Sequence, residues 1–416
     1  MTEGAKLVTK FRMTNIVKMR TLLVLVISFI FLETVFLIYS SQKTKSSSKI
    51  SRLSQEALQK YAEDILAKCK IEKYRAPCYD TEVPKLMDYI SMEDAFIVTQ
   101  KVQDKDPSYA FCHVLGHNLS AREVSKNPSK WKEVITRCPS GVCSNGCIHG
   151  GFQERFRSES LTLQQLEEVK PDLLDLCEPR GKWRPTGLEQ GSCYHAVGHL
   201  LMYMTNADLV KSTNLCEEIA KKSNGADYSQ VCFDGAFMQI FQPLEPEDFA
   251  LIKGMQPTKE KVYSFCEEFS GQKRGSCMSE SWPLFRREIM TPDGLVKFCS
   301  ETSPEEIDRC YTSLFYVLPV QFQFDMEKMR TFCTGLPQKK KAQCFANIAS
   351  RLIETDYRNI EKSVDLCKTA IGYDVGDACF QELLLYSTYN FRRGSEEFYH
   401  LCNALPENWG KLCLKN

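Results

Sequence analysis

The longest apolar run of the chain lies near its amino terminus. Residues 21–40 read TLLVLVISFIFLETVFLIYS, with Glu33 as the only charge, and about 20 apolar residues suffice for a helix that crosses a bilayer. The cations that precede the run are Lys6, Lys10, Arg12, Lys18 and Arg20. Because positive charge favours the cytoplasmic side, the pattern predicts a cytoplasmic tail at 1–20 and a transmembrane signal anchor at 21–40.

A polar stalk is expected at 41–53, followed by a domain outside the cytoplasm, in the periplasm, at the cell surface or in a secretory lumen. A cleaved signal peptide is the alternative, although its apolar region is usually shorter.

Beyond the stalk, apolar residues recur at the spacing of a helix. Phe345, Ile348 and Leu352 share one helical face. The segment SPEE at 303–306 has the residue types of a capping box, and Thr291 precedes Pro-Asp-Gly in another start signal. The pattern therefore predicts helices rather than strands throughout the domain.

Twenty cysteines, all after the predicted anchor, divide the domain into units. One series consists of Cys266, Cys299, Cys333, Cys367 and Cys402, and a second of Cys277, Cys310, Cys344, Cys379 and Cys413. Both advance by about 34 residues, a period that suits stacked pairs of antiparallel helices. In each unit, helix A would end near the first cysteine and helix B would carry the second.

This geometry predicts a disulfide within each unit, and thiols in such number favour an oxidising compartment. No C-x2-C pair is present, so zinc ribbons have no support. The expected bridges in the later units are Cys266–Cys277, Cys299–Cys310, Cys333–Cys344, Cys367–Cys379 and Cys402–Cys413. The same logic pairs Cys177–Cys193, Cys216–Cys232, Cys69–Cys78 and Cys138–Cys147, and leaves Cys112–Cys143 to pair across neighbouring units.

Disulfide-stapled helix pairs at a fixed period resemble the Sel1-like and tetratricopeptide-like cysteine-rich repeat proteins. The resemblance covers residues 60–416 and concerns architecture, because the W-x2-L-G-x2-Y consensus is absent. It implies a right-handed solenoid with a surface for proteins or peptidoglycan-like ligands. We expect an all-α fold of helix-pair repeats, an α/α solenoid or a closed toroid, with amino-terminal repeats at 54–260 and carboxyl-terminal repeats at 261–416.

Five of the six histidines occupy equivalent positions of successive B helices. These segments read FCHVLGHNL, GCIHGGFQERF, SCYHAVGHLLM and VCFDGAFMQIF. When the segments are superimposed, one position holds His113, His149, His195 and Asp234, and His117 and His199 follow four residues after the first and third. Two histidines at i and i+4 lie on one helical face and can reach one metal ion.

The five histidines therefore form a predicted site for zinc, copper or iron, since the thiols are consumed in bridges. In a shallow superhelix His113 and His199 would be about 20 Å apart, and two sites would follow. In a tightly curved array all five imidazoles would share one mononuclear or dinuclear centre. Asp234 and Glu154 are the candidate carboxylates for a ligand or general base. Haem between two histidines and a set of buried, hydrogen-bonded imidazoles are the alternatives.

Glycines inside the same helices admit two interpretations. Gly116, Gly150, Gly151, Gly198 and Gly235 each cost about 0.5–1 kcal/mol relative to alanine within a helix. Their missing side chains either admit a metal or substrate to the backbone, or let adjacent B helices pack closely.

Two classes of function remain open. One is metal-dependent chemistry, either hydrolysis or copper or iron redox work. The other is an interaction scaffold whose carboxyl-terminal repeats bind a protein partner. With 53 cationic and 53 acidic residues, the chain has no net charge to attract nucleic acid.

Overall fold

The computed structural model describes residues 53–139, 141–156, 161–181, 183–222, 226–244 and 246–415. The predicted tail, membrane anchor and stalk, apart from Leu53, lie outside these residues. Within the described part of the chain, no helix is both long enough and apolar enough to cross a membrane. Residues 53–416 form one compact unit.

The described residues fold into helices and contain no β-strand, only two isolated bridges. The α-helices are α2 (Gln55–Cys69), α3 (Arg75–Lys85), α4 (Met92–Lys105), α5 (His113–Lys126), α6 (Trp131–Ile135), α7 (Gly146–Phe156), α8 (Leu163–Leu174), α9 (Gly187–Met204), α10 (Leu209–Ala220), α11 (Ser229–Phe241), α12 (Pro246–Leu251), α13 (Val262–Cys266), α14 (Gly271–Glu280), α15 (Arg286–Ile289), α16 (Pro292–Ser300), α17 (Ile307–Gln321), α18 (Met326–Gly335), α19 (Gln338–Thr355), α20 (Ile360–Ile371), α21 (Gly376–Asn390), α22 (Glu396–Ala404) and α23 (Glu407–Lys415).

Short 3-10 helices connect several of them: η1 (Leu86–Asp88), η2 (Pro128–Lys130), η3 (Cys143–Asn145), η4 (Lys259–Lys261), η5 (Trp282–Phe285), η6 (Pro304–Glu306) and η7 (Tyr357–Asn359). The all-α prediction is therefore confirmed for the described residues.

Polar side chains begin several helices, including one of the two predicted starts. Thr291 caps α16 by accepting a hydrogen bond from the backbone N–H of Gly294. Thr186 and Glu189 form a complete capping box at α9, which fixes the start of the helix that carries two histidines. The predicted box at Ser303 does not form. Residues 304–306 make the 3-10 turn η6 instead, the Ser303 side chain makes no capping hydrogen bond, and α17 begins at Ile307.

All ten predicted disulfides are present, and they account for the twenty cysteines. In the later units each bridge joins helix A to helix B, as Cys299 of α16 joins Cys310 of α17. The bridge between Cys112 and Cys143 ties the start of α5 to η3, in the next unit. Eighteen of the cysteines are buried and Cys78 and Cys138 are half-buried, so the bridges lie in or at the edge of the core and hold each helix pair in register.

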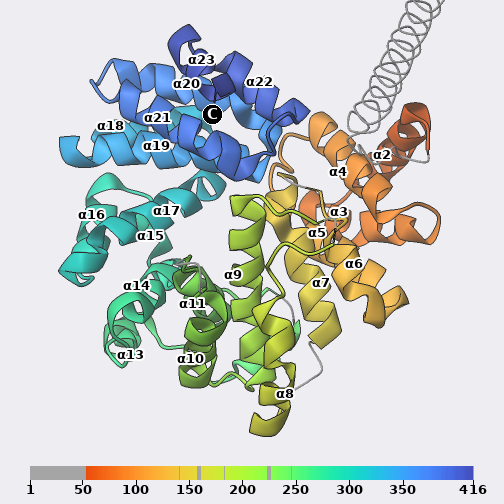
Figure 1. Ribbon diagram of the computed structural model, residues 1–416. Helices are drawn as coiled ribbons and strands as arrows, with labels where there is room; N and C mark the ends of the chain where they lie inside the picture. The colour runs from red at the N-terminus through yellow and green to blue at the C-terminus, as the bar shows by residue number, and fades with distance from the viewer. Residues whose placement is uncertain are drawn as a thin grey trace, which may run out of the picture. The chain divides into compact units, whose positions relative to one another are not determined.

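The B helices stack one on another in chain order and the last ones return to the middle of the array. Contacts run from α3 through α5, α7, α9, α11, α14, α17 and α19 to α21. Helix α21 then packs against α9, and α19 packs against η3, so segments far apart in the sequence lie side by side (Figure 1). The B helices thus face one another across a common interior.

Candidate metal centre

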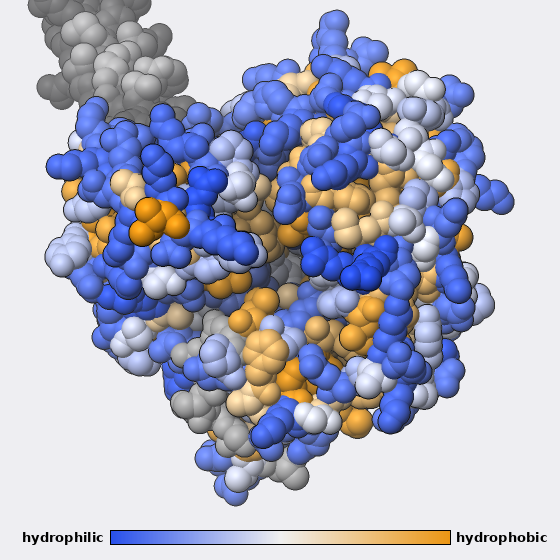
Figure 2. All heavy atoms as spheres, turned by 180° about the vertical axis from the view of Figure 1, so that it is seen from behind, coloured by the Kyte–Doolittle hydropathy of each residue, from blue (hydrophilic) through white to orange (hydrophobic). Residues whose placement is uncertain are grey.

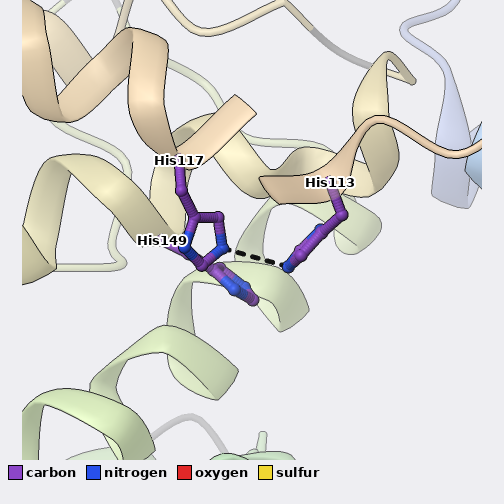
Figure 3. A group of neighbouring side chains, drawn as sticks. All are labelled: His113, His117 and His149. Atoms are coloured by element: carbon purple, nitrogen blue, oxygen red, sulfur yellow. Dashed lines mark hydrogen bonds between the residues drawn. The ribbon is translucent and has the colours of Figure 1, made fainter. Parts of the chain in front are cut away.

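Three histidine side chains from two adjacent B helices meet in the interior. His113 and His117 lie one turn apart on α5, and His149 projects from α7 toward both (Figure 3). The Nε2 atoms of His113 and His117 are 3.1 Å apart. One nitrogen from each of the three rings can be chosen so that all lie within 4.8 Å of one another. The three residues therefore form a group of the size that holds one ion.

The second histidine pair lies on the other side of His149. Helix α9 supplies His195 and His199, whose Nε2 atoms are 3.3 Å apart. The His149 ring is centred 5.3 Å from the His195 ring and 5.8 Å from the His199 ring. It is also centred 5.0 Å from the His113 ring. The array curves tightly enough to gather all five rings, so the shallow superhelix with two distant sites is excluded.

Glycines make this convergence possible by letting the B helices touch backbone to backbone. A Cβ on Gly150 would lie 2.2 Å from the carbonyl oxygen of His117, and one on Gly198 would lie 2.0 Å from that of Cys232. A Cβ on Gly235 would lie 2.0 Å from the carbonyl oxygen of His195. The close-packing interpretation is confirmed at these positions, and its effect is to bring the histidine rings together.

Burial keeps all five imidazoles neutral at neutral pH. Desolvation lowers the pKa of His113 to about 4, and the nearby positive charge of Arg351 contributes. Burial, followed by the neighbouring imidazoles, holds the pKa values of His117, His149 and His195 well below 6.5. Burial also lowers the pKa of His199. A neutral imidazole is the form that ligates a metal.

A glutamine on α11 sets the tautomer of His199. The Gln239 Oε1 atom lies 2.7 Å from the His199 Nδ1 atom, and an amide oxygen can only accept a hydrogen bond. His199 therefore carries its proton on Nδ1 and directs the lone pair of Nε2 toward His195. The His199 Nε2 atom can therefore accept a hydrogen bond from His195 Nε2, 3.3 Å away, or ligate an ion.

A small cavity opens beside the rings. It measures about 10 Å³, counted as the volume open to the centre of a water-sized sphere, which is room for about one water molecule. Its wall includes His113, His117, His149, Gln153, His199, Met238, Gln239, Gln242, Leu244 and Asp248.

Sequence reasoning did not identify Gln239, Gln242 and Asp248 of this wall, because none belongs to a repeated motif. Asp248 is buried in α12 and accepts hydrogen bonds from the Tyr203 hydroxyl and the Leu244 N–H. One feature of the sequence points to Gln239: it follows Met238, which lies one helical turn after Asp234, at the spacing that relates His117 to His113.

The two candidate carboxylates lie outside this wall. Asp234 is buried on α11 and forms an ion pair with Arg309 of α17. Glu154 is half-buried near the end of α7. His400, the sixth histidine, lies on α22 and contacts Glu361 at the surface, as expected for a residue outside the centre. Comparisons with protein-family models, curated proteins and solved structures find no match to this chain.

Proposed function

We propose that this chain is a membrane-anchored, extracytoplasmic helical-repeat protein whose five clustered histidines bind zinc, copper or iron. The convergence of His113, His117 and His149 within 4.8 Å carries the proposal. His195 and His199, whose rings also adjoin that of His149, would complete the coordination or hold a second ion. The curvature that gathers them is consistent with an array that closes into a toroid.

The spacing of the paired nitrogens fits coordination to one ion. Two imidazole nitrogens bound at about 2.0–2.1 Å are separated by about 2.9–3.4 Å when the bond angle is between 90° and 109°. The two Nε2 separations are 3.1 Å and 3.3 Å. Hydrogen bonds between imidazoles have similar lengths, so a measurement of metal content distinguishes the two arrangements.

A centre with three imidazole ligands is compatible with a catalytic metal site. Three protein ligands with an open fourth position are typical of catalytic rather than structural zinc, and a metal so held makes bound water acidic near neutral pH. The cavity adjoins this position, and Asp248 and Gln242 provide polar groups on its wall. Asp248 and Gln242 already bond to Tyr203 and Glu280. The Gln239 Nε2 atom, which makes no hydrogen bond with any described residue, would orient a water or a substrate group beside the imidazoles.

The alternative of haem finds little support in this geometry. The five rings contact one another at centroid separations of 4.7–5.8 Å, and the adjoining cavity holds about one water. A porphyrin between two of the histidines would require the glycine-packed helices to separate.

An interaction scaffold remains the second candidate function, favoured by apolar side chains on the later repeats. Ile371, Leu385, Leu412 and Leu414 are each about half exposed or more, and such side chains are common in protein interfaces. A scaffold and a metal centre are compatible, because they use different surfaces of the same helices.

The test is metal content measured by mass spectrometry on the full-length protein, with His113→Ala, His195→Ala and the double variant. His400→Ala serves as the matched control, because it removes the one histidine outside the centre. Stoichiometric metal in the wild type and in the control, with loss in the double variant, would support the proposal. The single variants distinguish the two arrangements, because a dinuclear centre would lose one ion from each side.

The metal proposal fails if correctly folded wild-type protein takes up no zinc, copper or iron under loading. Near-ultraviolet circular dichroism establishes that the variants retain the native fold. In that case the scaffold hypothesis stands, and crosslinking to partners becomes the next measurement.

A further inference from the structure

A buried arginine with unused hydrogen-bond donors lies in the interior of the later repeats. Arg351 sits in the middle of α19 and is 5 % exposed. Its Nε and Nη1 atoms make no hydrogen bond with any described residue. Glu354 forms an ion pair with it, but the Glu354 Oε2 atom is 3.7 Å from Nη1, too far for a hydrogen bond, and makes no hydrogen bond with any other described residue. Burying unpaired donors of a charged group costs stability, and an anion that accepts hydrogen bonds from them would recover it.

An aromatic ring covers one face of this guanidinium group. The Arg351 Cζ atom lies 3.4 Å from the centre of the Tyr316 ring. Tyr316 of α17 stays 41 % exposed and Tyr389 of α21 stays 37 % exposed, yet burial raises the pKa values of both hydroxyls. Tyr389 lies near Glu354 and Tyr316, so two partly exposed rings border the space beside the guanidinium, which we call the recess. The space-filling view shows a hollow near the middle of one face (Figure 2).

The recess adjoins the histidine centre on two sides. Tyr389 packs against α9, where a Cβ on Gly187 would lie 2.2 Å from its ring and one on Gly191 would lie 3.1 Å from its hydroxyl. Gly187, Gly191 and His195 follow one another at four-residue steps and share one face of α9. On the other side, α19 contacts η3, and a Cβ on Gly146 directly after η3 would lie 3.2 Å from His113 Nδ1.

We propose that the recess between α17, α19 and α21 binds the carboxylate of an organic ligand, with the Arg351 guanidinium as its anchor. A guanidinium offers parallel N–H donors that match the two oxygens of a carboxylate. Glu354 beside it keeps the local charge low, which favours a monoanion over a dianionic phosphate. Tyr316 and Tyr389 provide apolar faces for the organic part. The role of this recess as the substrate site of the metal centre rests on the function proposed above. The carboxylate site itself needs no metal.

The test measures anion binding and metal content in parallel on the full-length protein. Benzoate is the carboxylate probe and inorganic phosphate the comparison, each titrated by calorimetry at pH 7. The variants are Arg351→Met and the more conservative Arg351→Lys, which keeps the positive charge but loses the parallel N–H donors of the guanidinium. Arg330→Met is the control, because Arg330 on α18 pairs with Asp365 on α20. We expect benzoate affinity to fall at least tenfold in both Arg351 variants and to stay unchanged in the control, with metal content the same in all.

Three results would overturn the carboxylate site. Benzoate fails to bind the wild type at millimolar concentration, it binds the Arg351 variants equally well, or phosphate binds more tightly than benzoate. Binding that disappears only on removal of metal, and is indifferent to Arg351, also contradicts it, because the metal would then be the anchor. Benzoate binding that depends on Arg351 in a protein without metal supports the site while refuting the metal centre.

Discussion

At the residue scale, the decisive property of the centre is that its imidazoles are neutral and closely spaced. Five histidines packed ring to ring would repel one another if protonated, and burial already disfavours their charged forms. These five positions are predictable from the sequence, because the motif repeats and the i, i+4 spacing is a local property. Gln239 and Asp248 are not predictable in this way, because their proximity to the rings depends on how helices α11 and α12 pack.

The stability of the metal-free protein should fall as the pH falls from about 6.5 toward 4. The folded-state pKa of His113 is about 4 against an ordinary 6.5, and the other four are lowered too. Between pH 6.5 and pH 4 the unfolded chain binds more protons than the folded protein does. The contribution of the buried histidines to the free energy of unfolding is therefore present above pH 6.5 and is lost as the pH falls toward 4. Four carboxyl groups oppose the trend, because burial raises the pKa of Glu354 to about 7, that of Asp80 to about 6, and those of Glu280 and Glu382 above the ordinary value, but they are four groups against five.

Urea unfolding of chelated protein at pH 7 and pH 5 measures this effect. We expect the free energy of unfolding to be lower at pH 5 by about 2 kcal/mol or more. His400→Gln should leave the difference unchanged, because His400 is exposed at the surface. Equal stability at the two pH values would contradict the neutral, buried state of the rings.

Replacing Gln239 with leucine should weaken metal binding without unfolding the protein. The amide oxygen holds the His199 Nδ1 proton in place, and loss of such a partner typically lowers metal affinity by about 10–100-fold. Competition with a coloured chelator measures the affinity. Gln343→Leu on α19, whose amide bonds to Thr312 and Asp308, is the control and should bind metal normally. Unchanged affinity in Gln239→Leu would mean that His199 is not a ligand.

At the scale of elements, glycine contacts determine how closely two B helices approach. The sequence showed glycines inside helices and left open whether a ligand or a neighbouring helix filled the space. Local sequence cannot decide this, because the filling atoms are backbone carbonyls of residues more than 30 positions away, such as Cys232 beside Gly198. Helix starts were more predictable, since capping is local, although Ser303 shows that a 3-10 turn can take the place of a cap.

Gly198→Ala should destabilise the protein and disrupt the centre together. Its methyl group would overlap the Cys232 carbonyl oxygen, at 2.0 Å, and must push α11 away from α9. Overpacking of this kind costs about 1–3 kcal/mol, measured by thermal unfolding. Gly372→Ala is the matched control, because its nearest new contact is an ordinary 3.6 Å. If metal content in folded Gly198→Ala protein equals that of the wild type, close helix packing is not what positions the ligands.

At the scale of the whole domain, a few polar contacts hold the carboxyl-terminal repeats to the amino-terminal half. Arg358 in η7 donates hydrogen bonds to the Gln100 carbonyl, 3.2 Å away, and to Gln103 Oε1, 2.8 Å away. Arg392 donates to both carboxylate oxygens of Glu189 at the start of α9. The period of 34 residues predicted the repeats, but not these contacts, because the curvature of an array accumulates from small rotations at each interface.

Arg358→Met should lower the free energy of unfolding by about 1–3 kcal/mol, because it leaves acceptors such as Asp356 unpaired. Arg330→Met, which breaks an ion pair between neighbouring units, should cost less than about 1 kcal/mol. Chemical denaturation compares the two variants. Equal losses would show that the contacts between the first and last repeats are no stronger than those within the series.

The short reach of the disulfides has a consequence for how the chain matures. The longest bridge spans 31 residues and most span 9–16, so each can close as soon as its own helix pair has been synthesised. The histidines occupy positions 113–199 and belong to the first half to emerge, whereas Arg358 reaches back about 255 residues to Gln103. Oxidation can therefore follow the growing chain in order. The helices that carry the histidines are thus linked by disulfides before the later repeats that pack against them have been synthesised.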